Sequence, residues 1–270
     1  MELTLKQKIK EHYDISSLLY KKLWSNHIHH GYYIKGIESK KQATENLIKL
    51  LVRKASVKCK SKVLDVGCGI GGTSIWLSKN LECDVTGITI SPVQVDIANS
   101  ASEKLVKKPK FLVMDADNIK LNGKFDFIWA VEVISHLTDK PNFFRKSSQL
   151  LKKNGRMCIA AWMKADKLSR YEENKYIEPI EEGMLCTLPT LKEYLQLFDK
   201  NNLRLVYYED ASNNVKKTWE LCLDIIKDIG VWKFAVAHGK EFISYLKSFR
   251  SMKIGYDKGK FLYGIIIAEK

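Results

Sequence analysis

Hydrophobic residues in this chain form short apolar runs that alternate with longer, helically periodic segments. The runs of strand length are residues 62–66, 83–88, 110–114, 125–131, 156–162, 203–208 and 261–268. Between them, helical patterns cover residues 72–80, 92 to about 106, 141–151 and 191 to about 201. Capping residues mark two of these helix starts, at Ser91-Pro92-Val93-Gln94 and at Thr190-Leu191-Lys192-Glu193. Strands alternating with helices of this length predict an α/β fold on a mostly parallel sheet.

Two segments fall outside this alternation. Residues 1–58 have a helical pattern that closes with a helix capped by Ser39 and Gln42, and residues 211–258 place aromatic helices between the last two strands. Both segments are long enough to cover the edge where the strands end, which is where open α/β sheets bind ligands. We therefore expect one structural domain, with a core of residues 59–210 and a last strand within 259–270. The segments 1–58 and 211–258 are expected to form its N-terminal and C-terminal helical lids.

Composition places the chain among ordinary globular proteins, with 270 residues, 45% hydrophobic and 28% charged. The net charge of +14 by itself favours a nucleic-acid partner. Only six of the 45 basic residues are Arg, however, and 39 are Lys, whereas Arg is the side chain whose fork reads bases and phosphates. Lysines spread over exposed faces mainly promote solubility. We expect a solvated basic surface and no nucleic-acid partner.

The chain shows no sign of membrane insertion, secretion or a metal centre. Its apolar runs are much shorter than the roughly 18 residues of a membrane span, and Lys6, Lys8 and Lys10 interrupt the start of the chain. The six cysteines form no C-x-x-C pair, which is typical of a reducing compartment and not of a zinc site or a disulfide framework. We expect a cytoplasmic protein without a metal, as a monomer or a homodimer.

A glycine-rich loop directly follows the first expected strand, with the sequence Asp65-Val66-Gly67-Cys68-Gly69-Ile70-Gly71-Gly72. Glycines let the backbone turn sharply and approach a ligand closely. A dinucleotide site also requires an acid about 20 residues later, but residues 88–90 are Ile-Thr-Ile. The acid here is Asp65, before the glycines, where it suits a ligand amine better than a pyrophosphate. An NAD(P)-dependent oxidoreductase is thus a less favoured alternative.

The glycine loop resembles motif I of the class I S-adenosylmethionine (SAM) methyltransferases. Other segments are similar to one branch of that family, the γ-tocopherol and sterol C-methyltransferases and the related alkaloid N-methyltransferases. These segments are Tyr13-Asp14 with Ser16-Ser17, residues 23–33 with their histidines, the run 87–94 (Gly-Ile-Thr-Ile-Ser-Pro-Val-Gln), residues 114–117, and residues 125–129, 153–155 and 161–162. The resemblance spans residues 13 to about 166. It implies a seven-stranded Rossmann-like sheet, with helices on both faces, that binds SAM.

The resemblance also implies which residues contact the cofactor. Asp65, Gly67, Cys68 and Gly69 would face the methionine part, with Ala130 closing the same side. The remaining contacts, to the ribose and adenine, would come from Thr89, Ile90, Gln94, Asp115 and Ala116. Three of these residues have structural alternatives. Gln94 is placed to complete the capping box at Ser91, Asp115 to form a turn after a strand, and Thr89 to favour a strand.

One position departs from the pattern of the tocopherol enzymes, which carry E-x-x-E-H after the fourth strand. Here Glu132 and His136 are present, but Ser135 replaces the second acid. This change argues against a tocopherol-like phenol and leaves the methyl-transfer assignment intact. We expect His136 to act as a general base with Glu132 as its partner if the acceptor must lose a proton. The alternative for His136 is a structural hydrogen bond.

The acceptor pocket is expected to include Trp24, His29, His30, Tyr33 and Trp162, with Trp219 and Trp232 as further aromatic candidates. The alternatives are a surface position at a helix end for the two histidines and ordinary core packing for the aromatic residues. The favoured function is methylation, at C, N or O, of a hydrophobic small molecule such as a prenylated phenol, terpenoid, sterol, indole or alkaloid. A nucleic-acid or protein methyltransferase is the alternative, although residues 130–133 (Ala-Val-Glu-Val) lack an Asn-Pro-Pro-Tyr type of loop.

Overall fold

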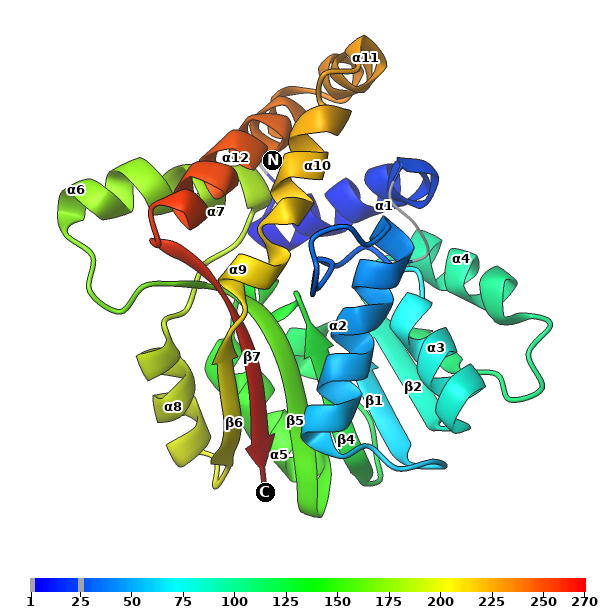
Figure 1. Cartoon of the computed structure of the whole chain (residues 1–270). Helices are drawn as coiled ribbons and strands as arrows, with labels where there is room; N and C mark the ends of the chain where they lie inside the picture. The colour runs from blue at the N-terminus through cyan, green and yellow to red at the C-terminus, as the bar shows by residue number, and fades with distance from the viewer. Residues whose placement is uncertain (1–2, 24–26) are drawn as a thin grey trace.

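A seven-stranded sheet forms the centre of the computed structural model (Figure 1), which describes residues 3–23 and 27–270. The strand order is β3-β2-β1-β4-β5-β7-β6, and β7 alone runs antiparallel to its neighbours within this sheet. The strands are β1 (Lys62–Val66), β2 (Asp84–Thr89), β3 (Lys110–Val113), β4 (Phe125–Val131), β5 (Leu151–Lys164), β6 (Arg204–Asp210) and β7 (Phe261–Glu269). The predicted α/β architecture with a mostly parallel sheet is confirmed.

Helices cover both faces of the sheet. On one face, α2 (Lys40–Ala55) and α3 (Gly72–Leu81) pack over Trp129 and Cys158. On the other face, α5 (Lys140–Leu150) and α8 (Leu191–Asp199) pack over a cluster that includes Leu64 and Ile128. Neighbouring residues of each central strand therefore bury their side chains in different clusters, which explains the continuous apolar runs of these strands. The helix α4 (Pro92–Ser102) lies beside β2 and β3.

A third layer of helices lies over the carboxyl ends of the parallel strands (Figure 1). It combines the N-terminal α1 (Leu5–Leu23) with α7 (Glu178–Met184) and with helices of the segment 211–258. The latter are α9 (Ser212–Val215), α10 (Lys217–Ile225), α11 (Ile229–Ala237) and α12 (Lys240–Asp257). Hydrogen bonds from Gly31 N to Thr218 Oγ1 (3.2 Å) and from Tyr33 N to the Asn214 carbonyl (2.8 Å) join the N-terminal segment to this insertion. In the described part of the chain, no helix combines the length and apolarity needed to cross a membrane.

The sequence pattern missed the elements between β5 and α8. A short helix α6 (Arg170–Glu172), a π-helical turn η3 (Glu173–Ile177) and α7 occupy this stretch. Their exposed faces are rich in Glu and Lys, and Ile177, Ile180 and Met184 provide few buried apolar positions. The helix α7 is stabilised by close packing on α12, where a Cβ on Gly183 would lie 2.5 Å from that of Ser248. This is tertiary packing that local periodicity does not record.

The strand β5 also begins earlier than expected, at Leu151, and includes the polar stretch Lys152-Lys153-Asn154-Gly155. The register with β4 shifts here, and Asn154 has a φ of +62°. A Cβ on Gly155 would lie 2.9 Å from the Lys152 carbonyl oxygen. The stretch is therefore a bulge within the strand, where exposed polar residues replace the apolar pattern.

Three histidines of the helical layer and its surroundings are held in their neutral form. The ring of His12 on α1 stacks at 4.9 Å on Phe242, and burial, with a contribution from His136, lowers its pKa to about 3. Burial, together with His29 and Lys41, also lowers the pKa of His27 to about 3. The pKa of His136 falls to about 4 through burial. All three values lie well below the ordinary 6.5.

We expect the protein to lose stability as the pH falls from 7 to 5. The unfolded chain takes up protons on these histidines below pH 6.5, whereas the folded chain does not until about pH 3 to 4, so acid favours unfolding. The carboxyl of Asp65 acts in the opposite sense, because burial raises its pKa to about 7. Three histidines outweigh one carboxyl, and we expect a Tm roughly 5 °C lower at pH 5 than at pH 7.

This difference is measured by thermal unfolding followed by circular dichroism at the two pH values. The variant His12→Phe, which retains an aromatic ring beside Phe242, should reduce the difference. The matched control His238→Gln changes an exposed histidine and should leave it unchanged. A Tm that is equal or higher at pH 5 would contradict the prediction.

Candidate active site

One cavity of about 260 Å³ lies between the carboxyl ends of β1, β2 and β4 and the helical layer above them. Its cofactor half, as we name it, is formed by the β1–α3 loop, the end of β2 and the turn η1 (Ala116–Asn118). Its acceptor half is formed by Glu132, His136 and Trp162 with residues of α1, α7, α10, α11 and α12. The predicted residues that line the cavity are Asp65, Gly67, Cys68, Gly69, Thr89, Ile90, Gln94, Asp115, Ala116, His29, His30, Glu132, His136 and Trp162.

Three predicted residues, Ala130, Tyr33 and Trp232, do not line the cavity, and the expectation for each is corrected. Ala130 is fully buried in the sheet core, and Val131, Glu132 and Val133 line the cavity in its place. Tyr33 is buried where the N-terminal segment meets the insertion, with Lys217 Nζ 5.5 Å from its ring centre. Trp24 lies outside the described residues.

The glycines of the β1–α3 loop are required for different physical reasons. Gly67, Gly69 and Gly71 all have positive φ, at +69°, +53° and +84°. A Cβ on Gly67 would lie 2.5 Å from Val133 Cγ2, so packing within the protein excludes a side chain. A Cβ on Gly69 would meet only Ile28 Cδ1, at 3.8 Å, and Gly69 lines the cavity. The loop thus approaches a ligand most closely at Gly69, beside the N-terminus of α3.

Asp65 is buried in β1 at the floor of the cofactor half. Ser74 Oγ donates a hydrogen bond of 2.6 Å to its Oδ2. Burial raises the pKa of Asp65 to about 7, although the bonds from Ser74 oppose the rise. A cationic ligand group placed beside it would favour the carboxylate, so the site suits an amine.

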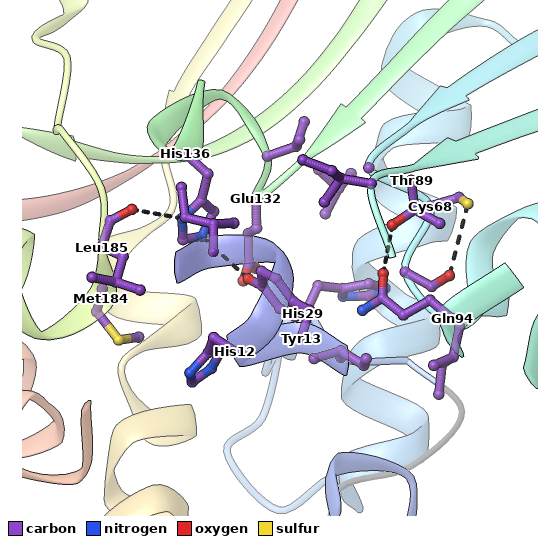
Figure 2. A pocket seen from close by; sticks show the side chains of 18 of the residues that line it. His12, Tyr13, His29, Cys68, Thr89, Gln94, Glu132, His136, Met184 and Leu185 are labelled. Carbon is purple, nitrogen blue, oxygen red and sulfur yellow. Dashed lines mark hydrogen bonds between the residues drawn. The ribbon is translucent and has the colours of Figure 1, made fainter. Parts of the chain in front are cut away.

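A pair of side chains at the end of β2 provides polar contacts. Thr89 Oγ1 donates to Gln94 Oε1 at 2.6 Å, and both residues line the cavity (Figure 2). The Gln94 backbone N–H donates to Ser91 Oγ at 3.1 Å, but the Gln94 side chain does not complete the capping box. The structural alternative for Gln94 is therefore wrong, since its side chain pairs with Thr89. Its amide NH₂ is left as a donor for a ligand.

Asp115 forms the turn that sequence analysis gave as its alternative role, and it also binds α1. Its Oδ1 accepts from the Asp117 N–H at 2.9 Å, which starts η1. Lys6 Nζ lies 2.6 Å from Asp115 Oδ2 and 2.9 Å from Asp117 Oδ2. Lys6 carries no signal in the sequence, because it stands in a row of lysines on a solvated helix. A second bond, from Ser91 Oγ to Asp14 Oδ1, holds α1 over the cofactor half.

His136 joins two helices across the acceptor half (Figure 2). Its Nδ1 is 3.2 Å from the Leu185 carbonyl oxygen, which only accepts, so Nδ1 carries the proton. Nε2 is then the acceptor for the Tyr13 hydroxyl, also at 3.2 Å. The pKa near 4 keeps this neutral tautomer throughout the neutral pH range. The sequence singled out Tyr13 only as part of a motif, and it gave no signal for Leu185.

Glu132 is held by His30 and Tyr263, and no hydrogen bond joins it to His136 in the described residues. Its Oε1 accepts from the His30 backbone N–H at 2.7 Å and from the Tyr263 hydroxyl at 2.7 Å, and His30 Nδ1 lies 3.0 Å away. Burial would raise the pKa of Glu132, but the charge and hydrogen bonds of its partners lower it below the ordinary value. The expected pairing of Glu132 with His136 is therefore corrected.

Glu132 also has a φ of +54°, which is rare for a residue other than glycine and costs of the order of 1 kcal/mol or more. Strain of this kind is concentrated at functional sites. His30, which has 2% of its surface exposed, holds the strained residue from the opposite side. A surface position at a helix end, the alternative for His30, is wrong.

A continuous row of aromatic rings walls the acceptor half. Ring centres are 6.3 Å apart for Trp162 and Trp219, 5.4 Å for Trp219 and Phe249, and 4.9 Å for Phe249 and Tyr245. Met184 and Leu185 of the unpredicted α7 region also line the cavity. Trp232 is not among the lining residues, and its indole N–H donates to the Ile226 carbonyl at 2.7 Å. The acceptor half is therefore apolar and aromatic, next to a polar cofactor half.

Comparison with known proteins identifies the family of the chain. The family model described as mycolic acid cyclopropane synthetase matches residues 3–241. The chain is 32% identical to the chloroplastic tocopherol O-methyltransferase of Arabidopsis thaliana, over 98% of this chain and 82% of the relative.

Solved structures share the fold across nearly the whole chain. The mycolic acid cyclopropane synthase CmaA1, solved with S-adenosylhomocysteine (SAH) and CTAB, superposes with a TM-score of 0.86 at 16% identity, covering 100% of this chain and 99% of that chain. The [4+2]-cyclase SpnF superposes with a TM-score of 0.84 at 20% identity, covering 99% and 96%. Because a cyclase shares the fold, the fold alone does not determine the reaction.

The family assignment rests on the sequence match, and the site geometry fits the cofactor of that family. Asp65 suits the amino group of a ligand, and the open backbone at Gly69 allows a ligand to approach closely. The amide of Gln94 suits a polar ring edge. The cofactor is SAM, and the NAD(P) alternative is wrong. The chain belongs to the mycolic acid cyclopropane synthetase family of class I SAM-dependent methyltransferases.

Proposed function

We propose that this enzyme transfers the methyl group of SAM to a hydrophobic small molecule bound in the acceptor half. The observation that supports this proposal best is the junction of a polar cofactor half with an apolar, aromatic acceptor half in one cavity. The relatives include enzymes named for tocopherol, for 27-O-demethylrifamycin SV and for 2-methyl-6-phytyl-1,4-hydroquinone. Hydrophobic acceptors are common to these names.

The cofactor half would hold SAM through four kinds of contact. Asp65 would bind the amino group, the backbone near Gly69 the carboxylate end, Gln94 the ribose or adenine, and the η1 turn at Asp115 and Ala116 the adenine edge. SAM supplies a methyl group already activated on a sulfonium. The protein then contributes mainly alignment, which is worth about 7–11 kcal/mol for well-oriented reactants.

The helical layer would exclude water from the reacting atoms. The contacts of α1 with the core support this role, because Lys6, Tyr13 and Asp14 bind three different core segments. We propose that His136 acts as a positioning residue that ties Tyr13 to Leu185. Its pKa of about 4 makes it a weak proton acceptor.

The proposed activity is tested with purified protein, labelled SAM and a panel of prenylphenols, indoles, terpenes and alkylamines. We expect label in at least one hydrophobic acceptor and micromolar binding of SAM and SAH by calorimetry. NADH and NADPH should not bind. Tight nicotinamide binding without SAM binding would contradict the proposal.

The two loop glycines should respond differently to alanine. Gly67→Ala should lower the Tm by several degrees, because the new Cβ meets Val133. Gly69→Ala should fold nearly normally, apart from about 1 kcal/mol of backbone strain, but weaken SAH binding at least tenfold. Asp65→Asn should also weaken SAH binding at least tenfold with little change in Tm. Calorimetry and thermal unfolding separate the two effects, and wild-type SAH affinity in Gly69→Ala would refute the assignment of this loop.

His136→Ala should reduce turnover by less than tenfold and raise the KM for the acceptor, since the residue positions α1 and α7. The shape of the pH–rate profile between pH 6 and 9 should match that of the wild type, because the pKa of His136 lies outside this range. A fall in kcat of a hundredfold or more, with a changed profile, would show instead that His136 is a general base.

We propose that the basic surface serves solubility and that the protein has no nucleic-acid partner. Lysine side chains without base contacts should give weak duplex DNA binding that is lost in moderate salt. An electrophoretic shift that persists at physiological salt would contradict this.

The six cysteines are all free in the structure, which supports the proposal of a reducing, cytoplasmic compartment.

A further inference from the structure

The charges that line the acceptor half have one sign. Glu132 provides the carboxylate of the acceptor half, and none of the described residues that line this half is Lys or Arg. Within the described chain, Lys6 is the lysine that reaches the cavity, and it is paired with Asp115 and Asp117 in the cofactor half. A phosphate or carboxylate on the acceptor would therefore face Glu132 without a compensating cation.

The partners of Glu132 favour its ionised form and leave one carboxylate oxygen facing the cavity. The bonds from the His30 N–H and the Tyr263 hydroxyl both fall on Oε1, as does the approach of His30 Nδ1. Among the described residues, no hydrogen bond reaches its Oε2, so this oxygen can face a ligand. Burial opposes ionisation, but these partners outweigh it and lower the pKa of the carboxyl. A strained φ of +54° aims this side chain at the cavity beside His29 and Tyr13 (Figure 2).

Two histidines of the acceptor half, and its carboxylate, are weak bases. The pKa is about 3 for His12 and about 4 for His136, and that of Glu132 lies below its ordinary value. Such groups are poorly matched to a phenol, whose pKa is about 10. An alkylammonium group, with a pKa of about 10 like that of lysine, also loses its proton before its nitrogen can attack. The neutral amine is then uncharged beside Glu132, whereas a phenolate would face Glu132 as a second anion.

The walls around Glu132 suit a positive charge. The rings of Trp162, Trp219 and Phe249 form one side, and His30 packs at 5.0 Å from Trp219. Aromatic faces attract cations, and the attraction grows when the cation is desolvated. An anion with flanking aromatic rings is a typical environment for an alkylated ammonium group.

We propose that the methyl acceptor is a hydrophobic amine and that Glu132 is the counter-ion of the ammonium group that methylation forms. This inference rests on the proposed function. The nitrogen lone pair forms a bond to the methyl carbon while the sulfur–carbon bond breaks and its electron pair stays on sulfur. The positive charge thus passes from the sulfonium to nitrogen. A tertiary amine that has released its ammonium proton to solvent completes this step without a further deprotonation, and Glu132 stabilises the charge where it arrives.

The proposal is tested with two ligands that differ in one atom. One is phenylbutyltrimethylammonium, and the other is its neutral isostere, in which carbon replaces the quaternary nitrogen. Titration into the SAH-loaded protein should show the ammonium binding at least tenfold more tightly, although the isostere is the more hydrophobic ligand. A sulfonate with the same phenylbutyl chain should bind most weakly. Equal or tighter binding of the isostere by the wild type would overturn the proposal without any variant.

Two variants separate the charge of Glu132 from its packing. Glu132→Gln retains an acceptor for Tyr263 and should remove the preference for the ammonium, reducing the affinity ratio to about one. Tyr263→Phe removes one of the bonds to Oε1 but keeps the charge, and it should retain the preference. If the ammonium preference survives in a folded Glu132→Gln protein, Glu132 is not the counter-ion.

The same titrations distinguish this proposal from the proposed function. Loss of SAH binding in the wild type would contradict the SAM site itself, whatever the ligand preference. If Glu132→Gln weakens SAM relative to SAH while the two isosteric ligands bind equally, Glu132 serves the cofactor sulfonium and the amine proposal is wrong. Turnover of a dimethylalkylamine from the panel, with no turnover of an alkylphenol of equal chain length, is the expected catalytic result.

Discussion

The carboxylate of Glu132 joins the three parts of the chain that enclose the cavity. Glu132 stands at the end of β4 and accepts a hydrogen bond from the backbone N–H of His30 in the N-terminal segment. It also accepts a hydrogen bond from the side-chain hydroxyl of Tyr263 in the last strand. A buried charge is stable only when such donors replace water. The N-terminal segment and the last strand therefore supply the donors that allow this anion to be buried.

The helix α1 contacts both halves of the cavity. Lys6 pairs with the η1 turn, Asp14 accepts from Ser91 before α4, and Tyr13 bonds to His136. The first two contacts reach the cofactor half and the third reaches the acceptor half. Since one rigid helix carries all three contacts, the positions of cofactor and acceptor are coupled through it. This arrangement fits the proposal that the methyl donor and acceptor share one enclosed cavity.

The fold of this chain is common to proteins that catalyse different reactions. A cyclase and a cyclopropane synthase share this architecture with the chain at similar TM-scores. The sheet and the glycine loop provide the common frame, while the acceptor half is built from the insertion, from α7 and from the residues after β4. In this chain those residues place one carboxylate, Glu132, among aromatic rings and weakly basic histidines. This carboxylate, without a described Lys or Arg in the same half, is the observation on which the amine proposal rests.

The sequence by itself determined the sheet, the glycine loop and most of the cofactor half, because these features depend on local patterns. Apolar runs define strands buried on both faces, and Gly67 and Gly71 are fixed by backbone geometry that short motifs record. Only the tertiary structure decided the acceptor half. The pairing of Glu132 with Tyr263, the link from Tyr13 to His136 and the Lys6 contact with Asp115 join residues 109 to 131 positions apart. The helix α7 packs into place although its own sequence has little periodicity. Burial then set the protonation of His12 and His136, which no residue type reveals before its surroundings are known.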